Sequence, residues 1–209
     1  MALTDLYTNL QLLLRWIHVF AGIVWIGHLY FFNFVNVPFQ GTIPGDVKKV
    51  VNPQLLGRAF WWFRWGAMIT FVVGMLLFVQ LYMYVPGVGF GPSELFSTAD
   101  GLTGRAIWIL LGMVFGTIMW FNVWFIIWPA QKKILPAVRD GAAVDPALPK
   151  RALMASRTNA YLSGPMLFGM IAPNHYGGIN VVTAVVAIAL GLLAIWWAIK
   201  TAPTVGKSV

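Results

Sequence analysis

Long apolar stretches separated by short polar segments limit most strongly how this chain can fold. A helix needs about 20 apolar residues to cross a bilayer. Four stretches are near that length, at 12–37, 66–84, 107–128 and 181–199. A fifth, at 160–172, is shorter, and its helix is expected to extend back past Arg157, as far as Pro146. The sequence therefore predicts an all-α, integral membrane bundle of five transmembrane helices, forming one domain over residues 1–209.

Proline and asparagine residues set the helix boundaries that we expect. Residues 40–53 are predicted to form a polar link, because Asn52 followed by Pro53 is typical of a helix start. Pro129 is expected to end the third span. Asn122 is a polar residue inside that span, and interhelical hydrogen bonding is the role we favour for it.

The basic residues predict an orientation in the membrane. Of the 14 Lys and Arg, only Arg15 and Arg105 fall on the side of the N-terminus when the five spans are threaded in order. The others fall on the opposite side: Lys48, Lys49, Arg58, Arg64, Lys132, Lys133, Arg139, Lys150, Arg151, Arg157, Lys200 and Lys207. Because positive loops stay cytoplasmic, we expect a bacterial inner-membrane protein with its N-terminus outside and its C-terminus in the cytoplasm.

The net charge of +8 does not indicate a nucleic-acid-binding protein. The basic residues lie beside apolar spans, where they set orientation and meet anionic lipid. We therefore expect membrane lipid, and no nucleic acid, as a partner. The absence of cysteine excludes thiolate metal sites and covalently attached haem in this chain.

Two of the three histidines lie in the first span. On a helix His18, Gly22 and Trp25 fall on one stripe, and the small residue would let a flat ligand or a neighbouring helix come close. His28 is ten residues further on, about 15 Å deeper along the axis, so one small ligand is not expected to bind both histidines. Alternatively, both are neutral histidines hydrogen-bonded within the bundle.

The third histidine follows the fourth span. With the expected orientation, His18 and His175 lie near the outer face and can share one level in the membrane. Neutral imidazole is a common ligand of haem b iron, and Arg15, one turn before His18, could pair with a propionate. We predict a haem b site with His18, His175, Arg15 and Trp25 as binding residues, the two histidines as iron ligands and His28 as a secondary metal site. A loop histidine without a ligand is the alternative for His175.

Other metal and catalytic chemistries have weaker support. Copper is a less probable alternative cofactor, with methionine ligands available at Met113, Met119, Met166 and Met170. Methionine at helical spacing more often serves packing. None of the six acidic residues lies within an expected span, which argues against a carboxylate proton relay.

Four blocks of sequence resemble one family, in the same order along the chain. They are RWIHVFAGIVWIGHLYFFNFVNVPF, FWWFRWGAMIT, GMVFGTIMWFNVWFIIWPAQKKI and SRTNAYLSGPMLFGMIAPNHY. Together they resemble the membrane part of the cytochrome-c-linked urate oxidases, also called urate hydroxylases. The first block is also similar to the first helix of copper-resistance D proteins and of membrane-embedded protoporphyrinogen oxidases.

The resemblance implies a redox membrane protein in which His18 and His175 are the most transferable positions. The urate enzymes carry a cytochrome c domain with a CxxCH site, and this sequence has no cysteine. We therefore expect a haem b protein that transfers electrons as a subunit or partner of a larger oxidoreductase, with a cytochrome c or another redox subunit supplied separately. A urate-type small-molecule oxidase and a non-redox accessory subunit are the alternative functions.

Overall fold

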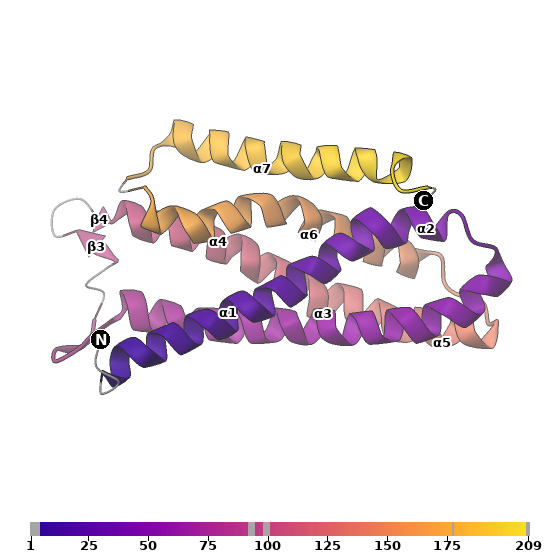
Figure 1. Cartoon of the computed structure of the whole chain (residues 1–209), viewed down its shortest axis with the longest axis horizontal. Coiled ribbons are helices and arrows are strands. Elements are labelled where there is room, and N and C mark those ends of the chain that lie inside the picture. Colours follow the sequence, from indigo (N-terminus) through magenta and orange to yellow (C-terminus); the bar gives the residue numbers. More distant parts are fainter. Residues whose placement is uncertain (1–4, 92–94, 98–100, 177, 208–209) are drawn as a thin grey trace.

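The computed structural model describes residues 5–91, 95–97, 101–176 and 178–207, which form five long helical rods (Figure 1). Four rods are composite or are extended by a short turn. The rods are α1 (Leu6–Tyr30) with the π-helical η1 (Phe31–Asn36) and α2 (Val37–Gln40); α3 (Gly45–Tyr82); α4 (Gly104–Phe121) with the π-helical η2 (Asn122–Ile127) and α5 (Trp128–Asp140); α6 (Ala147–Ile171) with the 3-10 turn η3 (Ala172–Asn174); and α7 (Val181–Thr201) with the 3-10 turn η4 (Ala202–Thr204).

Two small antiparallel hairpins fill the glycine-rich connection between α3 and α4. Strand β1 (Tyr84–Val85) pairs with β2 (Gly89–Phe90), and β3 (Phe96–Ser97) pairs with β4 (Gly101–Leu102). Side-chain caps fix where the neighbouring helices begin. The Thr103 hydroxyl accepts a hydrogen bond from the amide of Ala106 at the start of α4, and Asn180 forms a capping box with Thr183 at the start of α7.

The all-α prediction is confirmed, and four rods are long and apolar enough to cross a membrane. They are Leu6–Gln40, Gly45–Tyr82, Gly104–Asp140 and Val181–Thr204. The fourth rod, α6, is not among them because its first half carries Lys150, Arg151 and Arg157. As expected, α6 begins directly after Pro146 and continues past Arg157.

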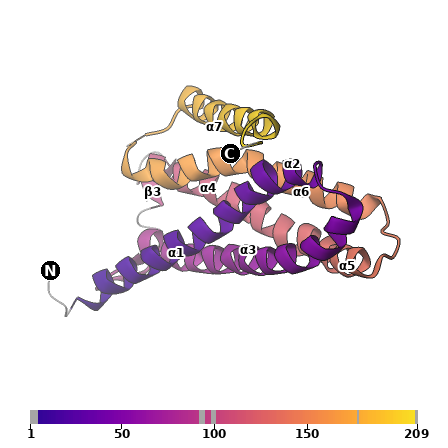
Figure 2. The same ribbon diagram turned by 45° about the vertical axis from the view of Figure 1, so that its right-hand side comes forward.

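Two groups of helices make up the bundle. Helix α1 crosses α3 obliquely, while α6 lies between α4 and α7 (Figures 1 and 2). The largest core joins the two groups: Phe32, Phe60 and Phe63 pack with Met119 and Val123. The first residues of α1 and the last of α7 lie at opposite ends of the long axis, as an odd number of antiparallel rods requires (Figure 1).

Glycines allow the backbones of the second group to touch. A Cβ on Gly164 of α6 would lie 2.5 Å from the carbonyl oxygen of Gly191 on α7. A Cβ on Gly169 would lie 2.9 Å from the amide nitrogen of Gly112 on α4. Both distances are shorter than van der Waals contact, so no larger residue fits at these crossings without moving a helix.

The prediction that Pro129 ends the third span is wrong. The helix continues through Pro129 to Asp140, and the six residues Asn122–Ile127 before it form a π-helical segment. The other π-helical segment, Phe31–Asn36, likewise lies just before a proline, Pro38. A proline lacks an N–H group and clashes with the carbonyl four residues earlier. A wider turn at that position accommodates both defects without ending the helix.

The prediction that a helix starts at Asn52 and Pro53 is also wrong. Helix α3 begins at Gly45 and contains Pro53. The side chain of Asn52 is not a cap. Its amide exchanges two hydrogen bonds with Gln40, with Nε2 of Gln40 2.7 Å from Oδ1 of Asn52 and Nδ2 of Asn52 3.0 Å from Oε1 of Gln40. This pair joins α2 to α3.

Candidate functional site

His18 lies at the contact between α1 and α3. Its Nδ1 is 2.9 Å from the backbone carbonyl oxygen of Thr70. A carbonyl can only accept, so Nδ1 carries the hydrogen and the neutral ring has its lone pair on Nε2. The contact depends on Gly74, because a Cβ there would lie 2.8 Å from Cε1 and 3.2 Å from Nδ1, but 3.9 Å from Nε2. The Nδ1–Cε1 edge therefore faces α3, and Nε2 is further from it.

The stripe of His18, Gly22 and Trp25 packs against α3. Gly22 faces Thr70, and the backbone nitrogen of Trp25 lies 3.1 Å from where a Cβ on Gly66 would be. Of the two roles expected for the small residues of this stripe, close approach of a helix is the one that the structure displays. The Trp25 side chain is buried, and its indole N–H has no hydrogen-bond partner among the described residues.

His28 has the same tautomer as His18. Its Nδ1 donates to the carbonyl oxygen of Val24, at 2.7 Å, which leaves the lone pair on Nε2. The ring lies beside Phe32 and lines an open cavity of about 440 Å³ between α1 and α3. Hydrogen bonding within the bundle, the alternative considered for both histidines, thus accounts for one nitrogen of each ring.

His175 is exposed in the turn after α6. Arg105 fixes the start of this turn, because its Nε donates to the carbonyl oxygen of Pro173 at 3.1 Å. The neighbouring Tyr176 contacts the rings of Trp108 and Phe168. Among the described contacts none joins His175 to His18, and the pairing of the two as iron ligands stays a prediction. The side chain of Arg15 is exposed on α1.

The expected metal ligands are not part of a cluster of possible metal-binding side chains among the described residues. The described residues contain no group of three or more His, Cys, Asp or Glu side chains that could hold a metal ion. Met119 and Met166 are buried in the main hydrophobic core. Met170 packs near Gly116. These three methionines therefore serve packing, in agreement with the role that helical spacing favours.

Buried amides form the polar centre of the bundle. The Nδ2 of Asn122, the first residue of η2, donates to Oδ1 of Asn159 on α6 at 2.8 Å, and Nδ2 of Asn159 donates to the carbonyl oxygen of Met119 at 2.9 Å. The interhelical role predicted for Asn122 is confirmed. Asn33, in the other π-helical segment, donates from Nδ2 to the hydroxyl of Ser156 on α6 at 2.9 Å.

The sequence prediction missed Asn33, Asn159 and Ser163. The hydroxyl groups of Tyr30 and Ser163 lie 2.9 Å apart, which adds a second polar link between the first rod and α6, beside that of Asn33 with Ser156. Asn33 and Asn159 could have been found by the same signal as Asn122, since both are amides close to or within apolar stretches. Oδ1 of Asn33 has no partner among the described residues.

The comparison with protein families agrees with the resemblance. The family model described as urate oxidase N-terminal matches residues 93–202, which is more than half of the chain. The chain belongs to the urate oxidase N-terminal family. No curated protein and no solved structure matches it.

The family match includes some of the candidate site residues and leaves out others. The matched region contains α4 to α7, the asparagine pair Asn122 and Asn159, and His175. Helices α1 and α3, which carry His18, His28 and Trp25, lie outside it. Membership of the urate oxidase N-terminal family therefore supports the scaffold around His175 and says nothing about the two histidines of α1.

Proposed function

We propose that this chain is the membrane electron-transfer part of a larger oxidoreductase and holds one haem b non-covalently, with His18 as an iron ligand. The observation that carries the proposal is the hydrogen bond from Nδ1 of His18 to the Thr70 carbonyl. Metal-bound histidines usually donate their second ring N–H to such an acceptor, which orients the ring and makes the other nitrogen more basic. The neutral ring, with its lone pair on Nε2, the ring nitrogen further from Gly74, could hold the iron of a haem.

The roles of the remaining residues follow from their positions. His175 is the second ligand in this proposal, because the start of α1 and the end of α6 lie at the same end of the bundle (Figure 1). Arg15 is exposed one turn before His18, where its guanidinium can pair with a carboxylate at the membrane surface. Bound haem would supply one-electron chemistry. His28, about 15 Å along the helix axis from His18, is a secondary metal site in this proposal.

The partner in this proposal is a cytochrome c or another redox subunit. It exchanges electrons at the outer end of the bundle, near His175. Oxidation of urate or a similar small molecule is the second candidate function, and the urate oxidase N-terminal family supports it. A non-redox accessory subunit is the third, supported by the hydrogen bonds that His18 and His28 already make within the protein.

Absorption spectra of the protein purified from membranes test these functions. We expect a low-spin b-type spectrum that is lost in His18→Ala and His175→Ala but retained in His28→Ala. Bleaching or reduction of that spectrum by added urate alone would favour the small-molecule oxidase. A protein without visible absorption would leave only the accessory role. Loss of the spectrum in His28→Ala alone would move the haem site to His28.

The proposal includes an inner-membrane location with the N-terminus outside. In this proposal α6 also crosses the membrane, which gives five spans in total. The chain has no cysteine, so single cysteines can report the orientation. Val88 lies in the exposed β1–β2 turn and Ala143 in the exposed link before α6. An impermeant thiol reagent should label Val88→Cys and not Ala143→Cys in intact cells. The reverse labelling would overturn the orientation, and labelling of both would mean that the rod from α4 to α5 does not cross the membrane.

A further inference from the structure

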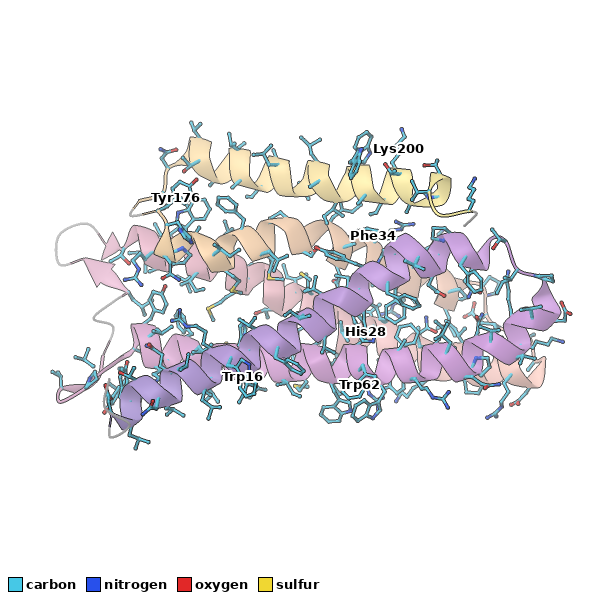
Figure 3. All side chains as sticks on the ribbon, in the orientation of Figure 1. Trp16, His28, Phe34, Trp62, Tyr176 and Lys200 are labelled. Carbon is cyan, nitrogen blue, oxygen red and sulfur yellow. The ribbon has the colours of Figure 1, made fainter. Side chains whose placement is uncertain are left out.

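An open groove between α1 and α3 contains two polar groups in an otherwise apolar lining. The cavity of about 440 Å³ is lined by Gly27, His28, Phe31, Leu55, Arg58, Ala59 and Trp62. In the view of Figure 3, His28 and Trp62 lie at the same level along the bundle, on adjacent helices. The rest of the lining is apolar, so Arg58 and His28 determine what the groove can recognise.

In the proposed orientation, the groove lies near the cytoplasmic edge of the bilayer, on the basic side of the bundle. Lys200, which follows the apolar part of α7, lies at a similar level along the long axis as Trp62 in Figure 3. Trp61, Trp62 and Trp197 are exposed, as expected for an interfacial aromatic belt. Lipid head groups occupy this depth, and the basic residues mark this side as the one that faces anionic lipid.

Both polar groups keep binding capacity for a ligand. Arg58 uses Nη1 for the carbonyl oxygen of Gln54, at 2.7 Å, and its other N–H groups are available. The ion pair in the described part of the chain is that of Arg139 with Asp140, so Arg58 has no carboxylate partner there. His28 uses Nδ1 for Val24, and the lone pair on Nε2 can accept a hydrogen bond. A guanidinium with a neighbouring acceptor suits a phosphate bearing a hydroxyl-rich group.

A second, apolar cavity lies between the same helices, next to the groove. It has a volume of about 260 Å³, and Trp62 lines both cavities. Its other lining residues are Trp16, Ile17, Phe20, Ala21, Val24, Trp61, Trp65, Gly66 and Ile69. These residues extend from Trp62 toward the opposite face of the membrane. A lipid could place its polar head group in the groove and its acyl chain in the apolar cavity.

We propose that this groove is a specific site for one anionic phospholipid. The phosphate binds Arg58, a head-group hydroxyl donates to Nε2 of His28, and an acyl chain lies along the Trp62 and Ile69 wall. The positive charge of Arg58 favours a phosphate over a neutral ring such as a quinone. The site does not depend on haem, so it stands or fails independently of the electron-transfer proposal.

Lipid titration of the purified full chain, followed by mass spectrometry of the intact complexes, tests the site. We expect one dioleoylphosphatidylglycerol to bind about tenfold more tightly than dioleoylphosphatidylcholine, and Arg58→Gln to remove that preference. Arg139→Gln removes the same charge from an exposed ion pair outside the groove and should leave the preference unchanged. Equal loss in both variants, or none in Arg58→Gln, would contradict the proposal.

A steric variant tests the groove without changing charge. A Cβ on Gly27 meets no atom within 4 Å, so Gly27→Phe can fill the groove while α1 keeps its contacts. Gly57→Phe is the matched control, because Gly57 also has free space but does not line the cavity. We expect lipid retention to be lost only in Gly27→Phe. Retention in both variants would overturn the site.

Two further probes distinguish the source of the ligand. Inorganic phosphate at millimolar concentration should not displace the lipid, because it has no acyl chain. Displacement by phosphate would reassign the groove to a soluble phosphate compound. A short-chain quinone that displaces the lipid equally well from the wild type and from Arg58→Gln would show that the groove takes a neutral ring, and the lipid proposal would fail.

Discussion

The α1–α3 pair and the α4–α6–α7 group are joined by different kinds of contact. In the first, glycines face both kinds of neighbour: Gly74 faces the ring of His18, whereas Gly66 faces the backbone nitrogen of Trp25, 3.1 Å from where its Cβ would be. In the second, backbone meets backbone, as Gly164 does with Gly191. A side chain opposite a glycine can change chemistry while the helices stay in place, whereas a backbone crossing tolerates no added atom. The comparison favours α4–α6–α7 as the scaffold. The proposed ligand His18 lies in the α1–α3 pair, and the proposed ligand His175 lies just after α6.

The largest effect is expected from a bulky residue at the α6–α7 crossing. Gly164→Leu should destabilise the protein by about 3 kcal/mol or separate α7 from α6, because its Cβ would overlap the Gly191 carbonyl. The free energy of unfolding in mixed detergent measures the effect. Gly57→Leu, with open space around it, is the control and should change stability little. Equal stability of the two variants would mean that the helices are not in backbone contact.

A moderate effect is expected at the asparagine pair that ties η2 to α6. Asn159→Leu removes the hydrogen bond to Met119 and leaves Nδ2 of Asn122 without its acceptor, which should cost about 1.5 kcal/mol. Asn122→Leu and the double variant complete a thermodynamic cycle. Thr117→Val, which removes an exposed hydroxyl from the same rod, should be near neutral. Additive single-variant effects would show that the two amides do not interact.

The smallest stability effect is expected in the α1–α3 pair. His18→Gln keeps an N–H donor for the Thr70 carbonyl but removes the imidazole, so the haem-free protein should change in stability by less than about 0.6 kcal/mol. The same unfolding assay applies. A loss as large as that of Gly164→Leu would make His18 a structural residue and would weaken the division between scaffold and site.

Apolar length and charge placement were enough to predict the helical class and most of the long helices. The extension of α6 beyond Arg157 and the role of Asn122 were also predictable, because amides in apolar stretches need hydrogen-bond partners. Among the described residues, four helices have the length and composition of a span, so the predicted count of five is not confirmed; the first half of α6 carries Lys150, Arg151 and Arg157.

The errors come from prolines and from pairing between distant residues. The sequence predicts helix boundaries at Pro129 and Pro53, but a π-helical turn precedes Pro129, and Gln40 pairs with Asn52. Neither effect is visible in local sequence, because each depends on a second segment or on a change in helix type. For the site, the sequence identified His18 as a position of interest, but its acceptor Thr70 and its neighbour Gly74 lie more than 50 residues away.

The haem content of the purified protein tests the central claim most directly. A pyridine haemochrome assay on protein solubilised freshly from membranes should return one haem b per chain. It should return about one for His28→Gln as well, and less than about one tenth for His18→Gln, because the neutral imidazole at His18 is the ligand in this account. A wild-type protein without haem, or full haem in His18→Gln with none in His28→Gln, would contradict it.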